Sequence, residues 1–159
     1  MNARGSDAAD PIQVLADQDV NDLVPVASFT NQVGHAEVVH IHAILNIYIG
    51  GKQVELPTGI GNFGFPLIHT HPAEFNVVHF HSTSPHTFYL GEAFAAWGIS
   101  MDATHIGRYR VGDGHILTME VQRQGRGAFV PSKLFGDYAI QSTGEAKGDR
   151  RDVINIRYT

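Results

Sequence analysis

The amino-acid sequence predicts an α+β domain dominated by β-structure, with about eight mostly antiparallel strands and one clear helix near residues 87–98. Three observations support this fold class. In most segments, apolar and polar residues alternate with the period of two that marks a half-buried strand. Gly and Pro residues divide these segments into short lengths. Only one stretch has apolar residues at helical spacing. We expect the strands to form an open sheet or a sandwich.

The chain of 159 residues fits a single domain of roughly 100–200 residues. Within residues 1–37, Arg4 is the only basic residue against six acidic ones. We expect residues 1–34 to form a flexible or loosely packed N-terminal segment and residues 35–159 to form one His-rich domain. The start of the chain lacks the basic region and apolar run of a signal peptide, so none is predicted. Two locations are then open, a cytoplasmic protein or a mature or trimmed extracytoplasmic one.

The first predicted element is a long strand over residues 37–49. Its odd-numbered positions from residue 39 onward are all apolar, whereas its even-numbered positions include His40 and His42. Because side chains alternate along a strand, these two His point to the same side, away from the apolar face. A Gly pair at residues 50–51 fits a two-residue hairpin turn, with residues 52–56 as the return strand.

Two shorter strands are expected after a Gly-rich loop at residues 57–66. Residues 67–71 would form the first strand and residues 75–82 the second. The period of two again places His residues together on one face. The residues that share a face are Leu67, His69 and His71 in the first strand, and Phe75, Val77, His79 and His81 in the second.

Residues 87–97 are the best helix candidate, with Leu90, Phe94 and Trp97 on one side and Gly98 at the end. Beyond the helix, shorter apolar alternations predict further strands. These lie near residues 106–111, 116–123, 138–141 and 153–158.

Composition excludes several classes of function. The net charge of −5 and the pI near 6.0 argue against a nucleic-acid partner, which requires a basic patch. No apolar run reaches the roughly 18 residues of a membrane-spanning segment. The absence of Cys removes disulfides, thiol nucleophiles and Cys-type zinc sites. The composition leaves open whether the protein forms a homo-oligomer.

The unusual feature is the content of ten His. Seven of them lie within residues 38–91, where Lys52, Glu55 and Glu74 are the only full charges. A segment this poor in charge is expected to be mostly buried. Buried imidazoles need partners, because an unpaired buried polar group costs about 1–3 kcal/mol.

Six of these His form three His-x-His pairs: His40 and His42, His69 and His71, and His79 and His81. On a strand, the two rings of a pair lie on one face about 6–7 Å apart along the chain, so both can converge on one ion. Six such ligands suffice for one octahedral ion or for two ions. We predict that these six His bind a divalent transition metal, Zn or Cu(II), because imidazole suits both and the absence of Cys argues against Cu(I).

Glu74 follows His71 by three residues and is a candidate ligand or general base, with an ordinary loop carboxylate as the alternative. His105 and His115 are more typical of surface or strand positions. The clustered His could instead form a hydrogen-bonded network without metal. They could also act as a pH switch, because crowded imidazoles repel one another once protonated below about pH 6.5.

Four motifs lie between residues 38 and 99: His40-Ile41-His42, His69-Thr70-His71, Val78-His79, and a segment from Tyr89-Leu90-Gly91 to Trp97-Gly98. Together with the closing segments at residues 135–138 and 152–158, they resemble an uncharacterised His-rich domain of bacterial membrane-anchored or secreted proteins. The resemblance covers roughly two thirds of the chain. It implies an extracytoplasmic setting, periplasmic or secreted, and no defined activity.

The sequence departs from that family's pattern at three positions. Ile44 replaces the third His of the first motif, Pro72 stands where the family tends to carry Asp, and His81 stands where it tends to carry a carboxylate. The ligand set is therefore expected to be shifted and richer in imidazole.

Two functions of different classes remain from the sequence. The first is metal capture, storage or delivery without catalysis, favoured by the lack of recognisable positioned carboxylates. The second is a metalloenzyme in which a three-His ion and its bound water catalyse hydration or hydrolysis, with Glu74 as the candidate base. The low charge around the His residues favours a shaped pocket, which suits the second. Of the two, we favour binding without catalysis, and the metalloenzyme is the alternative.

Overall fold

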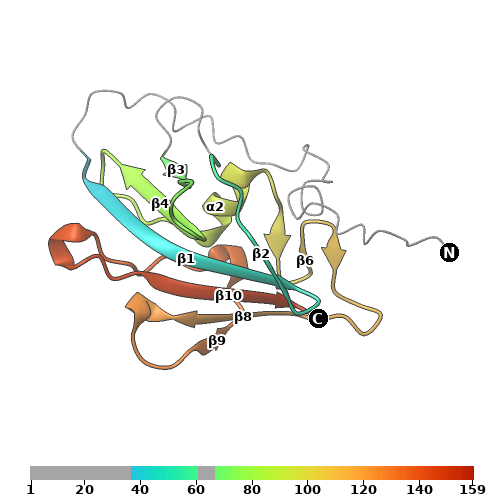
Figure 1. The fold of residues 1–159 in the computed structure, drawn as a ribbon. Helices are drawn as coiled ribbons and strands as arrows, with labels where there is room; N and C mark the ends of the chain where they lie inside the picture. The colour runs from blue at the N-terminus through green and yellow to red at the C-terminus, as the bar shows by residue number, and fades with distance from the viewer. Residues whose placement is uncertain (1–36, 61–66) are drawn as a thin grey trace.

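A computed structural model describes residues 37–60 and 67–159. The expected N-terminal segment 1–34 and most of the Gly-rich loop lie outside the described residues. The described chain contains ten strands and one α-helix, so the predicted β-dominated α+β fold class is confirmed (Figure 1). The elements are β1 (Val39–Ile49), β2 (Lys52–Val54), β3 (Ile68–His69), β4 (Val77–Ser82), α2 (Leu90–Trp97), β5 (Met101–Asp102), β6 (His105–Ile106), β7 (Tyr109–Arg110), β8 (Leu117–Gln122), β9 (Val130–Ser132) and β10 (Asp152–Tyr158).

One large sheet organises the molecule. Its strands follow the order β3-β4-β1-β10-β8-β9, with β2 also paired to β1. Only the pairing of β1 with β10 is parallel, and every other pairing in the described sheets is antiparallel. A second, small sheet contains β5, β6 and β7. The predicted mainly antiparallel arrangement is therefore confirmed, and it takes the form of open sheets.

The core lies on the face of the large sheet that the apolar alternation predicts. Ile47 of β1, Ile156 of β10 and Phe80 of β4 are completely buried. They belong to the same buried cluster as Leu90 and Phe94 of α2, so the helix packs against this apolar face. Burying a side chain of this size stabilises the fold by about 1.5–3 kcal/mol.

The opposite face of the sheet is polar. At its centre, the side-chain amide of Asn46 donates to Asn155 at 3.0 Å. Glu120 then accepts hydrogen bonds from Asn155 at 3.0 Å and from Arg157 at 2.6 Å. The predicted His residues lie on the same face, on β1, β4 and the β3 segment.

The hairpin and the helix follow the prediction, with shifted boundaries. Gly50 and Gly51 have φ angles of 56° and 79°, which glycine adopts without the steric cost of a side chain. The helix begins at Leu90, three residues later than expected, and ends at Gly98 with φ of 80°. The strand expected at residues 67–71 is reduced to two residues, and β5 and β9 were not predicted.

The strand predicted at residues 138–141 is wrong. Its only ladder contact is an isolated bridge between Ala139 and Tyr89. The backbone groups of this segment bond elsewhere, because the Ile140 amide donates to Phe88 and the Gln141 amide donates to the carboxylate of Asp152. The strand predicted at residues 106–111 is likewise divided into β6 and β7.

Asp152 explains much of this irregular region. It is completely buried, and its carboxylate accepts hydrogen bonds from the Tyr138 hydroxyl at 2.8 Å, the Gln141 amide at 2.7 Å and the Gln124 amide at 2.8 Å. Burial and the hydrogen bond to Asp152 raise the pKa of the Tyr138 hydroxyl. Three donors from two separate segments, residues 138–141 and the turn at Gln124, therefore converge on the first residue of β10.

Within the described part of the chain, no helix has the length and apolar character needed to cross a membrane.

Candidate metal centre

Three neighbouring strands bring the predicted His residues together on the polar face of the large sheet. In the register of β1 and β4, His40 lies opposite His81, and His42 lies opposite His79. β3 flanks β4 on its other side, where His69 lies opposite His79. The alternation of side chains keeps all of these rings on one face.

His79 lies at the centre of the cluster. Its ring centroid is 4.3 Å from that of His42 on β1, 5.1 Å from that of His69 on β3, and 4.5 Å from that of His71. Among the six rings, those of His40 and His71 reach solvent, and the other four are buried. The cluster therefore has a buried centre and a solvent-accessible ring on each side.

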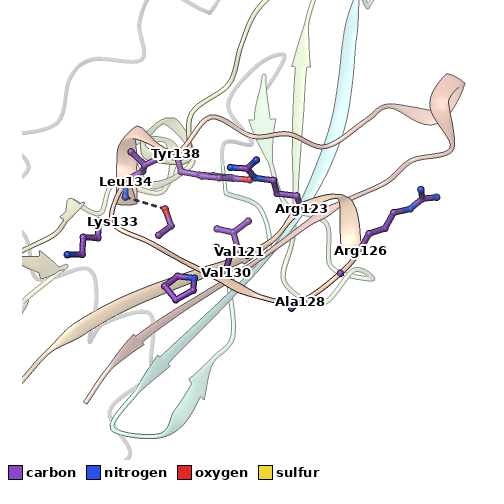
Figure 2. A pocket seen from close by; sticks show the side chains of 11 residues that line it. Val121, Arg123, Arg126, Ala128, Val130, Lys133, Leu134 and Tyr138 are labelled. Atoms are coloured by element: carbon purple, nitrogen blue, oxygen red, sulfur yellow. Dashed lines mark hydrogen bonds between the residues drawn. The ribbon is translucent and has the colours of Figure 1, made fainter.

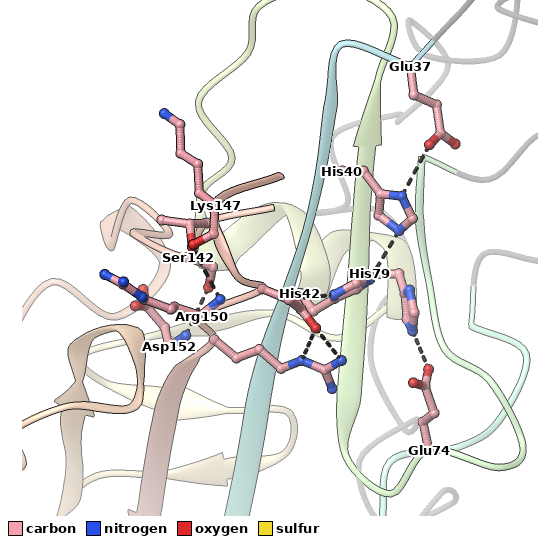
Figure 3. Close-up of polar contacts among 12 residues, drawn as sticks. Glu37, His40, His42, Glu74, His79, Ser142, Lys147, Arg150 and Asp152 are labelled. Carbon is pink, nitrogen blue, oxygen red and sulfur yellow. Dashed lines mark hydrogen bonds and ion pairs between the residues drawn. The ribbon is translucent and has the colours of Figure 1, made fainter. Parts of the chain in front are cut away.

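Two carboxylates hold outer ring nitrogens on the β1 side of the cluster, and Figure 3 shows one of them, Glu37, against His40. Glu37 places one oxygen 2.7 Å from His81 Nδ1 and the other 3.2 Å from His40 Nδ1. Asp149 accepts a hydrogen bond from His42 Nδ1 at 2.7 Å. Carboxylates that hold the outer nitrogen in this way orient the rings of metal-binding His in many proteins.

Asp149 is itself held in place. Its φ of 44° lies in the left-handed region that side chains other than Gly seldom adopt. Arg151 donates two hydrogen bonds to its second oxygen, at 3.0 and 2.7 Å. Burial raises the pKa of Asp149, but the hydrogen bonds from Arg151 and His42 outweigh this effect, and the net pKa lies below the usual value. Asp149 is therefore an ionised anchor for the ring of His42.

A third carboxylate contacts the centre of the cluster. Glu74 accepts a hydrogen bond from His79 Nε2. That bond lowers the pKa of Glu74, and the positive charge of Arg151 lowers it further. The sequence-predicted candidate Glu74 therefore lies in the cluster as an ionised carboxylate.

The bonded nitrogens determine which ring atoms are free to bind an ion. A carboxylate is an acceptor only, so Nδ1 carries the hydrogen in His40, His42 and His81, and in a neutral ring the lone pair is then on Nε2. Nε2 of His40 faces Nε2 of His42 at 3.0 Å. Nε2 of His81 is buried and has no hydrogen-bond partner among the described residues. The two facing Nε2 atoms of His40 and His42, and the buried Nε2 of His81, are therefore the ring atoms that a bound cation would satisfy.

Burial keeps the central rings uncharged. It lowers the pKa of His79 and of His81, and this effect outweighs that of the hydrogen bonds that the rings donate to Glu74 and Glu37, which raise it. At neutral pH both rings are therefore unprotonated at one nitrogen, which is the form that binds a metal.

Two groups of three His have ligand atoms within 4.8 Å of one another. The first contains His40, His79 and His81, and the second contains His69, His71 and His79. In the second group, Nε2 of His69 lies 3.2 Å from Nε2 of His71. Two nitrogens bound to a tetrahedral zinc ion at 2.0–2.1 Å lie about 3.3–3.4 Å apart, so this pair already has nearly the required spacing.

The remaining described His residues have other partners. His86 contacts Glu92 at 3.0 Å, near the start of α2. His105 bonds to Ser100 at 2.7 Å, and His115 stacks on Tyr158. None of these three belongs to either group of candidate ligands.

Sequence reasoning did not identify Glu37 or Asp149. Glu37 lies two residues before β1 and three residues before His40, and this spacing is the only local signal that links it to the cluster. Asp149 is 107 residues from His42, so no local pattern indicates their contact. The expectation that the cluster lacks positioned carboxylates is therefore wrong.

Two pockets differ in their relation to this site. One, of about 410 Å³, lies between the start of β1 and the loop at residues 142–147, and Glu37 and His40 line it. Another, of about 560 Å³, is lined by Arg123, Arg126 and Lys133 over the apolar side chains of β8 and β9 (Figure 2). No His lines the second pocket, so only the first adjoins the cluster.

Comparisons of the chain with protein-family models, with curated proteins and with solved structures found no match.

Proposed function

We propose that this protein binds a divalent transition metal, Zn or Cu(II), at the His cluster, and that it captures, stores or delivers that metal. The observation that carries this proposal is the close approach of Nε2 of His40 and His42, together with the buried Nε2 of His81 that has no partner among the described residues, in three rings whose Nδ1 atoms are held against carboxylates. Because these Nε2 atoms lack a donor, a cation between them replaces lone-pair repulsion with coordination.

The donor set supports the choice of metal. All six candidate ligands are imidazoles, which suit Zn and Cu(II). Hard cations such as Mg²⁺ and Ca²⁺ prefer oxygen ligands, and the carboxylates contact the rings rather than one another. The chain has no Cys, so it offers no thiolate for Cu(I).

The cellular setting follows from the resemblance in sequence. The motifs that resemble the His-rich family belong to bacterial membrane-anchored or secreted proteins, so we place this protein outside the cytoplasm, in the periplasm or beyond. Metal capture or delivery in that compartment is consistent with a site whose outer rings, His40 and His71, reach solvent.

A second candidate function is metal-dependent hydration or hydrolysis. It is favoured by Glu74, an ionised carboxylate that contacts His79 near the solvent-accessible side of the cluster. A metal ion lowers the pKa of its bound water to about 7, and a neighbouring carboxylate can accept the proton. The distinguishing result would be turnover that Glu74→Gln abolishes while metal content is unchanged.

The first experiment is elemental analysis of untagged protein purified without immobilised metal or chelator. We expect near-integral Zn or Cu per chain. His40→Ala or His71→Ala should lower metal content or affinity sharply, whereas His115→Ala, which changes an exposed ring outside the cluster, should not.

Equal and small effects from all three variants would contradict the assignment of ligands. Protein that purifies metal-free, with a melting temperature that no added ion changes, would overturn the proposed function. The cluster would then be a His–carboxylate network with a structural or pH-sensing role.

A further inference from the structure

We infer that the cluster holds two metal ions, one on each side of His79, with this ring as the ligand common to both. The inference rests on the proposed function and adds the number of ions and the division of the ligands between them. Its starting point is the pair of three-His groups, which share His79 and no other residue.

The order of the strands creates two sides. β4 lies between β3 and β1, so His79 has the rings of β1 on one side and those of the β3 segment on the other. Each side contributes a His-x-His pair whose Nε2 atoms approach closely, at 3.0 Å for His40 and His42 and at 3.2 Å for His69 and His71. Each pair can therefore supply two ligands to one ion. A single ion would either bind only one of the two pairs or require the rings of both pairs to move toward it.

Both sides have enough ligands for an ion. On the β1 side, His81 joins His40 and His79, and His42 lies within reach. On the β3 side, His69 and His71 join His79, and Glu74 contacts the same His79 ring. Each side thus offers three or four donors, which matches the coordination number of zinc.

Carboxylates around the cluster offset the charge of bound ions. Glu37, Glu74 and Asp149 each contact a ring of the cluster and together carry three negative charges. Arg151 pairs with Asp149 and offsets one of these charges, so the carboxylates compensate one divalent ion in full, and a second ion needs the negative charge of a deprotonated His79 ring for part of its own.

The shared role of His79 requires both of its ring nitrogens. Its Nε2 now donates to Glu74, so binding of the second ion at that atom displaces the proton to solvent and leaves an imidazolate between the ions. This negative ring adds to the charge of the three carboxylates. Glu74 then becomes free to bind the ion on the β3 side through oxygen.

The test is the stoichiometry of Cu(II) bound to the full chain after gel filtration, measured by elemental analysis. We expect about two ions per chain for the wild type and for His115→Ala, and about one for His71→Ala and for His40→Ala. Because His71 is exposed, we expect His71→Ala to fold as the wild type does. Circular dichroism checks the secondary structure of each variant.

Electron paramagnetic resonance distinguishes a shared ligand from two independent sites. Two Cu(II) ions bridged by His79 should couple, so the signal should rise with the first equivalent and fall with the second. In His71→Ala, the signal should remain that of a single uncoupled ion.

The outcomes separate the two proposals. Saturation of the wild type at one ion, or two ions retained by His71→Ala, would overturn the two-ion arrangement while the proposed metal binding stands. Two ions with fully additive signals would overturn the shared role of His79. Loss of an ion from His115→Ala would show that this ion binds adventitiously at the surface, and it would also contradict the two-ion arrangement. Binding of no ion would overturn the proposed function itself.

Discussion

At the scale of single residues, the chemistry of the cluster depends on which nitrogen of each ring is occupied. Glu37 uses its two oxygens on two rings, His40 and His81, and so fixes the orientation of both Nε2 atoms. Without such a carboxylate, each ring can rotate or change tautomer, and the lone pairs no longer converge. This makes Glu37 a positioning residue for two predicted ligands at once.

Glu37→Gln should therefore weaken metal binding. A Gln side chain has one acceptor oxygen, so it can hold only one of the two rings. We expect the dissociation constant for Zn to rise by about 10–100-fold, the usual effect of removing such a partner. Competition with a chromophoric chelator measures this change. Glu55→Gln, at an exposed position after β2, is the matched control, and an equal affinity in both variants would contradict the role of Glu37.

At the scale of elements, the loop at residues 142–149 connects the cluster to the far end of the chain. It lies directly against β1, because a Cβ added at Gly144 would be only 2.5 Å from the backbone oxygen of His40. The same loop carries Asp149, which holds His42. The close approach of Gly144 thus sets the position from which Asp149 reaches the cluster.

Gly144→Ala should displace this loop from β1 and draw Asp149 away from His42. We expect lower metal affinity together with a modest loss of thermal stability, measured by chelator competition and by thermal unfolding. Lys147→Ala, an exposed change in the same loop, should alter neither. A Gly144→Ala protein with wild-type affinity would show that the loop does not position the site.

The polar face of the large sheet gives a prediction about pH. Hydrogen bonds from Asn155 and Arg157 lower the pKa of Glu120 in the folded protein. A lowered folded-state pKa stabilises the fold above the unfolded pKa of about 4.3, and this contribution is lost as the pH falls through the folded value. Glu120→Gln should therefore be less stable than wild type at pH 7, and the difference should shrink near pH 3. Thermal unfolding at both pH values checks this, and a difference that grows with acidity would contradict it.

At the scale of the whole molecule, the cluster joins segments that are distant in sequence. β1, β4, the β3 segment and the loop of Asp149 all contribute, so an ion bound there links both ends of the described chain. A ligand that binds only the folded state stabilises it by an amount that rises with the logarithm of the free ligand concentration, about 2.7 kcal/mol at one hundred times the dissociation constant.

Saturating Zn should therefore raise the melting temperature by roughly 5–10 °C for a domain of this size. Chelator should reverse the increase, and a double variant, His40→Ala with His71→Ala, should show little of it. If the metal raised the melting temperature of that double variant as much as that of wild type, the stabilising ion would have to bind outside the cluster.

The sequence by itself determined that the two His of each pair share a face and that the opposite face of β1 is apolar. It also determined the Gly hairpin and the helix that ends at Gly98, because alternation and turn chemistry are local properties. The assignment of the six His as metal ligands stays a prediction.

Only the tertiary structure decided that β4 lies between β3 and β1, which places His79 at the centre of the cluster. It also decided that residues 138–141 bond to Asp152 and to the chain before α2 instead of forming a strand. The contact of Asp149 with His42 spans 107 residues and has no local signature. Such features depend on which segments pack together, and that choice is made by the burial of the whole apolar core rather than by any short pattern of residues.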